Sequence, residues 1–487
     1  MELFAGVDVA TAEVRTVAAD AQGRLHARAR APLAAPVSSR PGWWEQDARS
    51  WWPATAAALT ALTDRLGSRR SSLVAIAVSA TSGTVVALDR HREPLAPALT
   101  YADQRAVPEA RAAQDAGAAR WARLGLRVQP SFGLPKWAWL LHQPGVGGRA
   151  AHLAHASDAV VARLVGQQVP TDWSHALKSG YDPLRGEWAT EALDALGIPG
   201  HLLPEVGSPT ATAGAISREA AGATGLPAGC AVRLAMTDAC AAQLAAGASV
   251  PGRFVSVLGS TLVLKGASRE LVADPDGAVY SHRHPAGWWL PGGASSTGAN
   301  ALTHGFTGRD LGELDRMAAR HGPARGIIYP LVGRGERFPF AVPEAEGFAV
   351  GDLPDEMARY RATLEGVAFV ERLGYERLAA LGAPEPASIA VTGGGSTSAV
   401  WNRIRAAVLG VPLVATPDAT TALGACILAA AGTVGPDLTA AMTAMAARGE
   451  PVDASSEDAD ALEASYQWFT RTLADRGWVT PGGPGGR

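Results

Sequence analysis

The 487-residue chain has few cysteines and no long uninterrupted apolar run. Its three cysteines, Cys230, Cys240 and Cys426, form neither a CxxC pair nor a disulfide framework, so we expect small buried residues in a reduced compartment. Glycine, proline or charge interrupts every apolar run before it reaches the roughly 20 residues of a membrane-spanning helix. The first residues lack the basic start and the cleavage site of a signal peptide. We therefore expect a cytoplasmic protein with no membrane partner.

The chain also has no large excess of positive or of negative charge. The formal net charge is −3 and the pI is near 6.4, which disfavours a nucleic-acid partner or an anionic membrane surface. Several nucleotide and metal motifs are missing as well. The chain has no GxxxxGK[ST] loop and no strand-coupled GxGxxG, and its histidines show no zinc spacing such as HxxxH. These absences exclude a P-loop, a dinucleotide-binding fingerprint and a zinc site of common spacing.

The composition and the order of predicted elements indicate a large α/β protein. Apolar residues make up 47% of the chain and charged residues 18%, which allows a sizeable core and two large domains. Strands and helices alternate in both halves, with helices expected at residues 150–164 and 295–304. A strand-turn-strand opening at residues 3–19 recurs at residues 254–265. We therefore predict two related domains, residues 1–247 and 248–487.

One carboxylate stands where an apolar run becomes an alanine-rich helical pattern. This is Asp238, in LAMTDACAAQLAAGA. An acid at a helix start can satisfy free backbone N–H groups, and that role alone explains an Asp there. The alternative is a general base, which needs an ionised carboxylate within hydrogen-bond reach of an attacking hydroxyl. A phosphate-sized Gly-Ser-Thr turn follows soon after, and this combination favours phosphoryl transfer.

A second carboxylate, Asp8, ends the first predicted strand, directly before the turn at Ala10–Glu13. Carboxylates, water and phosphate oxygens are the ligands that Mg²⁺ prefers, so Asp8 is a candidate magnesium residue. Aspartate is also a common turn former, which leaves a purely structural reading open.

Two turns of small residues follow predicted strands. They are Gly259-Ser260-Thr261 and Gly393-Gly394-Gly395. Glycine lets backbone N–H groups approach a phosphate closely, although tight turns between strands explain most such glycines. Elsewhere, Tyr101, Asp103 and Arg105 bring together a ring, an acid and a guanidinium. That set suits a polyhydroxylated ligand, and a solvated loop is the alternative.

Taken in order, these segments resemble the FGGY carbohydrate kinases, of the actin/hexokinase-like superfamily. The resemblance covers nearly the whole chain. It rests on FAGVDVATAEVRTVAAD, GWWEQDARSWW, VSATSGTVVALDRHREPLAPALTYADQR, MTDACAAQLAAGA, VSVLGSTLVLK, VTGGGSTSAVWNRIRAAVLGVPL and TALGACILAAAG. In that family these segments correspond to the first phosphate loop, a Trp-rich segment, the sugar region, the catalytic aspartate, the second phosphate loop, the adenosine segment and the helix after it.

The resemblance implies two actin/hexokinase-like (ribonuclease H-like) α/β domains with a cleft between them. It implies transfer of a phosphoryl group from ATP, with Mg²⁺, to a terminal hydroxyl of a sugar. Carried over by position, Asp238 is the general base and Asp8 the carboxylate linked to Mg²⁺. The residues expected around the sugar are Thr81, Ser82, Gly83, Tyr101, Asp103 and Arg105. The residues expected to contact ATP are Thr11, Arg15, Gly259, Ser260, Thr261, Gly293, Thr297, Gly394, Gly395 and Ser398.

The branch of the family is read from the sugar region. Xylulose kinases usually show a GQMHG-like segment where this chain has Ala80-Thr81-Ser82-Gly83-Thr84, and glycerol kinases show an Arg-Glu pair. The TSGT form, SHALKSGYD and GERFPF look most like the D-ribulose kinase and xylulose-kinase-like branch. We therefore expect a ketopentose substrate, D-ribulose first, with xylulose or another polyol as the alternative. A homodimer is a family-level expectation.

The first phosphate loop departs from the family pattern, which is approximately DxGTSxxK/R. Here Ala10 replaces a glycine, Ala12 removes a hydroxyl, and Glu13 adds negative charge near a polyanion. At about 5 Å and an effective dielectric of 20, that repulsion is roughly 3 kcal/mol, and Arg15 partly offsets it. This departure keeps a second class of function open, a catalytically weak paralogue that binds sugar or nucleotide without turnover.

Overall fold

The computed structural model describes residues 1–453 and 459–480, and their contacts divide the chain into two compact units. The first unit contains Met1–Ala245, His282–Gly287 and Ala419–Ala446; the remaining described residues form the second unit. The expected α/β architecture is confirmed, with one mixed sheet at the centre of each unit. The division into residues 1–247 and 248–487 stays a prediction, since the packing units are discontinuous along the chain.

The first unit is built on a six-stranded sheet in which β1 (Leu3–Val9) is one of the interior strands. β1 pairs in parallel with β6 (Leu73–Ala80) and antiparallel with β2 (Glu13–Asp20). The sheet is completed by β14 (Thr212–Ala215) and β15 (Ala231–Arg233) beyond β6, and by β3 (Leu25–Pro32) beyond β2. Every residue of β1 is buried, because helices cover both faces of the strand.

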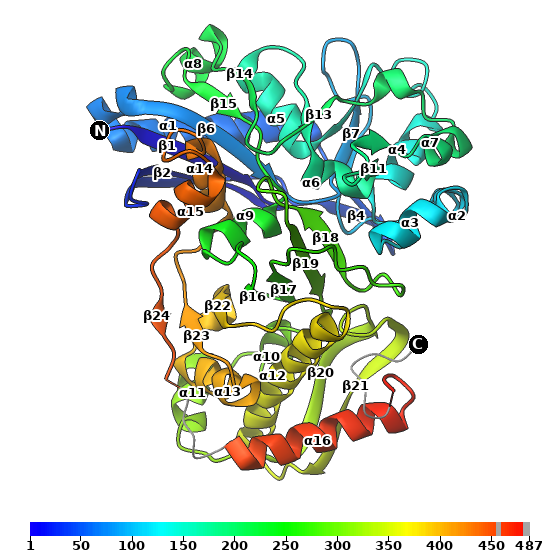
Figure 1. Ribbon diagram of the computed structural model, residues 1–487, viewed down its shortest axis with the longest axis vertical. Helices are drawn as coiled ribbons and strands as arrows, with labels where there is room; N and C mark the ends of the chain where they lie inside the picture. The colour runs from blue at the N-terminus through cyan, green and yellow to red at the C-terminus, as the bar shows by residue number, and fades with distance from the viewer. Residues whose placement is uncertain (454–458, 481–487) are drawn as a thin grey trace. The chain divides into compact units, whose positions relative to one another are not determined.

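Alternate residues of β1 face different helices. Its odd-numbered residues join a hydrophobic core with α1 (Trp51–Leu66). Its even-numbered residues face α14 (Thr421–Ala430), whose Cys426 Sγ lies 3.1 Å from the carbonyl oxygen of Phe4. Figure 1 shows α14, in orange, beside the blue strands. A helix from late in the sequence therefore covers the strand that carries Asp8.

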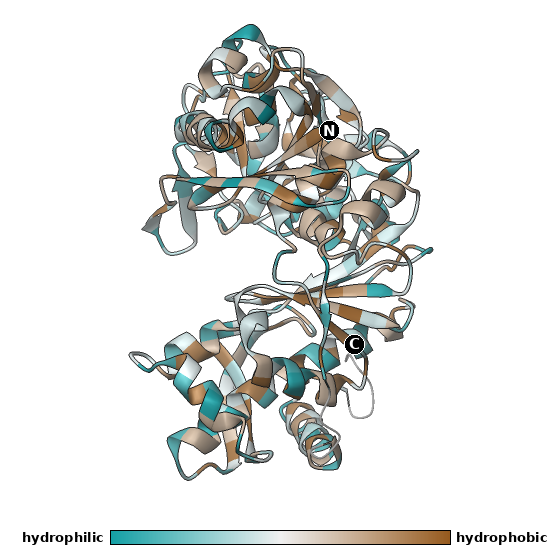
Figure 2. Ribbon diagram, turned by 90° about the vertical axis from the view of Figure 1, so that its left-hand side faces the viewer, coloured by the Kyte–Doolittle hydropathy of each residue, from teal (hydrophilic) through white to brown (hydrophobic). Residues whose placement is uncertain are grey.

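Figure 2 shows hydrophobic stretches along the strands. The remaining elements of the first unit pack around its central sheet. A five-stranded sheet contains β4 (Val37–Arg40), β5 (Trp43–Gln46), β8 (Ala98–Leu99), β7 (Val85–Leu88) and β9 (His152–His155). Two short pairs are β10 (Thr171–Asp172) with β13 (Val206–Gly207), and β11 (Tyr181–Asp182) with β12 (Glu187–Trp188). The further helices are α2 (Val107–Ala116), α3 (Ala118–Leu124), α4 (Gly133–Leu141), α5 (Ala156–Val165), α6 (Trp173–Ala176), α7 (Thr190–Leu196), α8 (Arg218–Thr224), α9 (Asp238–Ala245) and α15 (Leu438–Met445).

The second unit has a separate long hairpin and most of a seven-stranded sheet, in which only residues 282 and 283 are grouped with the first unit. The sheet order is β18 (Tyr280–Arg283), β19 (Trp289–Ala294), β17 (Leu262–Gly266), β16 (Arg253–Leu258), β22 (Ser388–Thr392), β23 (Leu413–Ala415) and β24 (Glu450–Pro451). The hairpin consists of β20 (Arg325–Glu336) and β21 (Val342–Asp352). The helices are α10 (Asn300–Gly305), α11 (Leu311–Ala318), α12 (Glu356–Ala380), α13 (Ala399–Leu409) and α16 (Ala459–Asp475).

Two of the expected helices are partly wrong. Residues 152–155, expected in a helix, form strand β9, and α5 begins only at Ala156. Of residues 295–304, only 300–304 are helical, as part of α10, and residues 295–299 lie between the end of β19 and that helix. The three cysteines are buried and none of them forms a disulfide, as expected. Within residues 1–453 and 459–480, no helix is long and apolar enough to cross a membrane.

The closest backbone approach between β1 and α14 generates a stability prediction. A Cβ added to Gly6 would lie 1.9 Å from the carbonyl oxygen of Ala422 and 2.4 Å from the backbone nitrogen of Cys426. Neither backbone atom can move without shifting α14. We therefore expect Gly6→Ala to lower the free energy of unfolding by about 3 kcal/mol or more, measured by urea denaturation.

The matched control is Gly222→Ala in helix α8, where an added Cβ meets nothing within 4 Å. Alanine favours a helix over glycine by about 0.5–1 kcal/mol, so this variant is expected to be as stable as the parent or more stable. Equal stability of the two variants would contradict the packing of α14 on β1.

Candidate active site

The first unit places two candidate loops at one edge of its central sheet. β1 and β6 are parallel, with Asp8 opposite Ser79 and Val9 opposite Ala80. The turns that follow them, residues 10–13 and 81–84, therefore emerge at the same edge, where parallel α/β sheets bind ligands. The predicted phosphate loop and the predicted sugar turn are thus neighbours.

Asp238 begins helix α9 in this unit. Its carboxylate accepts a hydrogen bond from the backbone N–H of Ala239 at 2.8 Å and another from the backbone N–H of Ser82. Burial raises the pKa of Asp238, while these hydrogen bonds and the cationic groups of His175 and Lys178 act to lower it. The side chain is partly accessible to solvent. Asp238 is therefore a helix-start residue and, in addition, a desolvated carboxylate beside the predicted sugar turn.

Asp8 is more deeply buried, with 3% of its surface exposed. Burial raises its pKa to about 7; Arg15 lowers it, and Asp238 and Glu13 raise it. The nearest cationic atom is Nη1 of Arg15, 3.6 Å from Oδ2. The electrostatic effect of Asp238 on Asp8 shows that the two predicted carboxylates share one region of the first unit.

Glu13 competes with Asp8 for Arg15. Its Oε1 lies 2.8 Å from Nε of Arg15, a shorter contact than that of Arg15 with Asp8. Arg30 lies 3.9 Å from the other carboxylate oxygen of Glu13. The guanidinium expected to face phosphate is therefore paired with an acid of its own loop.

The first loop is held by Gln46, a residue that the sequence reasoning missed. Its amide Nε2 donates to the carbonyl oxygens of Thr11 at 2.9 Å and Ala34 at 2.7 Å. Its Oε1 accepts the indole N–H of Trp51 at 2.9 Å. This buried amide thus links the first loop to the segment that follows β3 and to α1. The only signal in the sequence was a polar residue inside the Trp-rich segment.

Several predicted sugar residues lie together. One small cavity is lined by the first-loop residue Thr11, by Thr81 and by Tyr101. Ser82 reaches Asp238 through its backbone, as described above. Gly83 has a positive φ of 81°, which allows the sharp turn after β6. The structure therefore brings Thr11, Thr81, Ser82 and Tyr101 to one region, and their contact with sugar stays a prediction.

Asp103 and Arg105 form a buried ion pair with each other. Nε of Arg105 donates to Oδ2 of Asp103 at 2.8 Å, and the backbone N–H of Trp44 donates to the same carboxylate at 2.7 Å. The Arg105 guanidinium also lies 3.8 Å from the centroid of the Trp43 ring. Both side chains are buried, so this geometry favours a supporting role. Direct contact of either with sugar stays a prediction.

Lys136 of α4 is a buried lysine beside the predicted sugar turn, and the sequence patterns did not point to it as a site residue. Its Nζ donates to the carbonyl oxygens of Gly83 and Thr100, each at 2.7 Å. Burial lowers the pKa of Lys136 to about 7, with Asp103 opposing that shift. A lone lysine in the apolar run LPKWAWLL was a signal, since an unpaired lysine is rarely buried. Lys136 ties the turn at residues 81–84 to the segment that carries Tyr101.

The second unit has its own edge of small residues. β16 and β22 are parallel neighbours, and the turns at residues 259–261 and 393–395 follow them. A Cβ on Gly393 would lie 2.6 Å from the carbonyl oxygen of Leu258, so the two strand ends are adjacent. A Cβ on Gly394 would meet nothing within 4 Å, which leaves its backbone open to a ligand. These turns suit a phosphate-bearing molecule.

The other predicted nucleotide residues have partners within the second unit. A Cβ on Gly293 would lie 2.3 Å from a phenylalanine ring, and one on Gly395 2.5 Å from a leucine side chain. The hydroxyl of Thr297 donates to a buried glutamate at 3.2 Å, and Ser398 caps α13. Packing and capping explain these four residues without a ligand, so their contact with ATP stays a prediction.

The surroundings of Asp8 fit Mg²⁺. No cluster of three or more ligating His, Cys, Asp or Glu residues occurs in the described part of the chain. Mg²⁺ bound with nucleotide, however, needs only one or two carboxylates besides phosphate oxygens and water. A buried carboxylate with a raised pKa and only one guanidinium nearby gains from a cation.

Comparison with known proteins identifies the class to which this fold and these loops belong. Residues 3–245 match the N-terminal domain of the FGGY family of carbohydrate kinases, and residues 254–433 match its C-terminal domain. A xylulose kinase of Streptomyces coelicolor is 32% identical, with 97% of this chain and 96% of the relative covered. A glycerol kinase of Citrifermentans bemidjiense is 29% identical, with 93% and 94% covered.

Solved structures of this family have a similar fold. The crystal structure of xylulose kinase from Rhodospirillum rubrum is 28% identical and has a TM-score of 0.86, with 97% of this chain and 99% of that chain covered. This chain belongs to the FGGY family of carbohydrate kinases. It is therefore a phosphotransferase with an alcohol acceptor, and kinases of this family use ATP. These relatives are named for xylulose and glycerol, and the D-ribulose branch expected from the sequence is not among them.

The Glu13–Arg15 pair yields a prediction about ATP. Glu13→Gln removes one negative charge and releases Arg15 toward phosphate. Exposed ion pairs contribute about 0.2–1 kcal/mol, so we expect the KM for Mg-ATP to fall by about 1.5- to 5-fold. The measurement is initial rate against ATP concentration at saturating sugar.

The control variant is Glu219→Gln, an exposed carboxylate of α8 that carries the same charge change outside this loop. It is expected to leave the KM for ATP unchanged. An unchanged or higher KM in Glu13→Gln would show that Glu13 does not restrain Arg15.

Proposed function

We propose that this kinase transfers the γ-phosphoryl group of ATP to a terminal hydroxyl of a ketopentose, with D-xylulose as the first candidate. The observation that supports this reaction is the position of Asp238 at the start of α9, where its carboxylate is hydrogen-bonded to the backbone of the turn at residues 81–84. The choice of xylulose is supported by the two Streptomyces relatives named xylulose kinase, at 32% and 31% identity.

In this proposal Asp238 accepts the proton of the attacking hydroxyl. The hydroxyl oxygen bonds to the γ-phosphorus as the bond from that phosphorus to the β–γ bridging oxygen of ATP breaks, and ADP leaves with those electrons. The proton needs an acceptor within hydrogen-bond reach, which a carboxylate beside the sugar turn supplies. Its two backbone N–H partners fix the carboxylate's direction before the sugar binds.

Asp8 is proposed to hold Mg²⁺, through water or directly, together with phosphate oxygens. The cation neutralises charge on the phosphates when bound. Thr11 and Arg15 are proposed to face the phosphates from the first loop. In the second unit the turns at residues 259–261 and 393–395 are proposed to bind ATP through their backbone N–H groups.

D-ribulose is the second ketose to test, because residues Ala80–Thr84 lack the histidine of the GQMHG-like segment. The paired state of Arg15 also keeps a weakly active kinase as an alternative. Both possibilities are separated from the main proposal by measuring rates with several acceptors.

The experiment measures ADP release with D-xylulose, L-xylulose, D-ribulose, L-ribulose, ribitol and glycerol. We expect the highest kcat/KM with D-xylulose. Replacing Asp238 by Asn should lower kcat with that sugar by about 10²-fold or more, because the proton acceptor is lost. Sugar affinity, measured by calorimetry, should stay within a few-fold.

The control is Asp194→Asn, an exposed carboxylate of α7, for which the parent kcat is expected. Near-normal turnover in Asp238→Asn would refute the role of Asp238. Absence of phosphate transfer to every acceptor in the parent protein would favour the weakly active alternative.

A further inference from the structure

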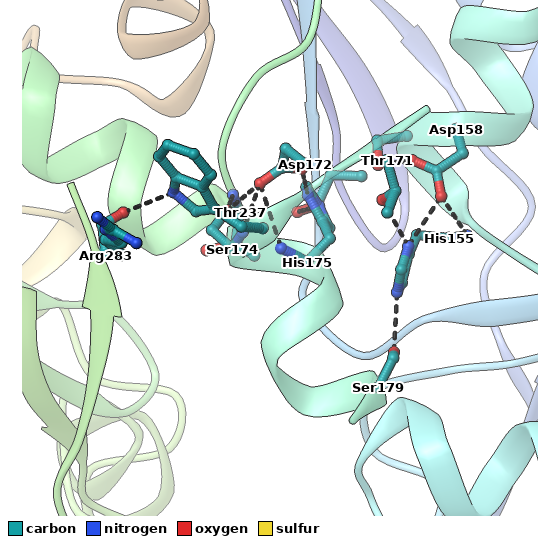
Figure 3. Close-up of polar contacts among 12 residues, drawn as sticks. His155, Asp158, Thr171, Asp172, Ser174, His175, Ser179, Thr237 and Arg283 are labelled. Atoms are coloured by element: carbon teal, nitrogen blue, oxygen red, sulfur yellow. Dashed lines mark hydrogen bonds and ion pairs between the residues drawn. The ribbon is translucent and has the colours of Figure 1, made fainter. Parts of the chain in front are cut away.

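A polar network in the first unit connects the two chain segments that meet at the proposed sugar site. Figure 3 shows it, running from α6 to the residue before Asp238. At its centre is Asp172, the N-cap of α6, whose Oδ1 accepts from the backbone N–H of Ser174 at 2.8 Å and from its hydroxyl at 2.5 Å. The same serine oxygen accepts the backbone N–H of Thr237 at 3.0 Å. The chain entering α9 is thereby held by a buried carboxylate.

The other arm of the network is His175. Its Nδ1 bonds to Oδ2 of Asp172, and its Nε2 lies 3.2 Å from the carbonyl oxygen of Ala80. Both partners can only accept, so both ring nitrogens must donate, and a ring that donates twice is an imidazolium. Ala80 ends β6, directly before the turn at residues 81–84. One buried cation thus joins the sugar turn to the cap of α6.

The neighbouring histidine differs. His155 is equally buried, and its ring centroid lies 5.6 Å from that of His175. Its Nδ1 lies 2.8 Å from Asp158 and its Nε2 2.8 Å from the hydroxyl of Ser179. A hydroxyl can donate to a ring nitrogen, so a neutral ring satisfies these contacts. The contacts of His175 therefore require a charged ring, whereas the contacts of His155 do not require one.

We propose that His175 is a positioning residue of this kinase, a fixed imidazolium that holds the turn at residues 81–84 and the start of α9 in register and supplies positive potential to Asp238. This inference rests on the proposed role of Asp238. His175 is fully buried and both of its ring nitrogens are bonded to Asp172 and Ala80, so neither nitrogen is left for the sugar hydroxyl or for phosphate. Its effect passes through Ala80 on one side and through Asp172, Ser174 and Thr237 on the other.

The charges around His175 agree with this role. Burial disfavours the charged ring, but the carboxylate of Asp172 outweighs it, and the pKa of His175 rises to about 9. Asp158 on α5 acts in the same direction. The cationic ring and Lys178 in turn favour the ionised form of Asp238. The titratable groups around His175 are Asp172 and Lys178 on its own segment, Asp158 on α5, His155 on β9 and Asp238 on α9.

The test compares His175→Gln with the matched control His155→Gln. Glutamine at 175 retains a donor for Ala80 and removes the charge. We expect kcat to fall by about 10- to 100-fold per folded molecule, as for other residues that orient a catalytic group. The KM for ATP should stay within a few-fold. The acid limb of the kcat–pH profile should move to higher pH, by up to about one unit, because Asp238 loses a nearby cation.

His155→Gln is expected to lose thermal stability without moving the acid limb. Ser174→Ala provides a milder variant if His175→Gln does not fold. It leaves the cation in place and removes the acceptor for Thr237, so kcat should fall several-fold with the acid limb unmoved.

The inference would be overturned if folded His175→Gln kept the kcat and the acid limb of the parent protein, or if Ser174→Ala kept the parent kcat. In either case Asp238→Asn would still show its expected loss of kcat. Turnover retained in Asp238→Asn would instead overturn the proposed function on which the inference rests. The two failures are therefore distinguishable.

Discussion

The site in the first unit depends on keeping two carboxylates ionised where burial opposes their charge. Desolvation raises the pKa of both Asp8 and Asp238, and their mutual repulsion adds to the shift of Asp8. Isolated buried charges are too costly to persist without compensation. The chain places Arg15 beside Asp8, and His175 and Lys178 near Asp238. The arrangement of the surrounding elements follows from this requirement.

Rigid support reaches the site from several elements. Lys136 and Gln46 use buried polar atoms to fix the backbone of the turn at residues 81–84 and of the first loop. α14, which comes from late in the sequence, closes over the face of β1 that carries Asp8. Such preorganisation is valuable in phosphoryl transfer, where the protein contributes mainly position and electrostatics. The loop that departs from the family pattern is also the one where Glu13 occupies the available guanidinium.

The sequence allowed the α/β class to be predicted, and it offered both aspartates as candidates, because alternating strands and helices and acids beside turns of small residues are local patterns. It did not reveal Gln46, Lys136 or His175 as supporting residues, since their role depends on carbonyl groups distant in sequence. The sequence also did not reveal that Asp103 and Arg105 bind each other, and their contact with sugar stays a prediction. The return of residues 419–446 to the first unit has no local signal either.

The most direct test is the pH dependence of kcat at saturating Mg²⁺, ATP and D-xylulose. A base must be ionised to accept a proton, and a raised pKa moves its protonation to higher pH, so kcat should fall as pH drops through that raised value. With Mg²⁺ bound at Asp8 as proposed, saturating Mg²⁺ keeps that carboxylate ionised, so the proposed base Asp238 is the carboxylate whose protonation the acid limb reports. We expect an acid limb above the usual aspartate pKa of about 3.9, and we expect that limb to be absent from the residual rate of Asp238→Asn. An acid limb at or below the usual aspartate pKa, or the same limb in Asp238→Asn, would contradict the role of Asp238 as the base.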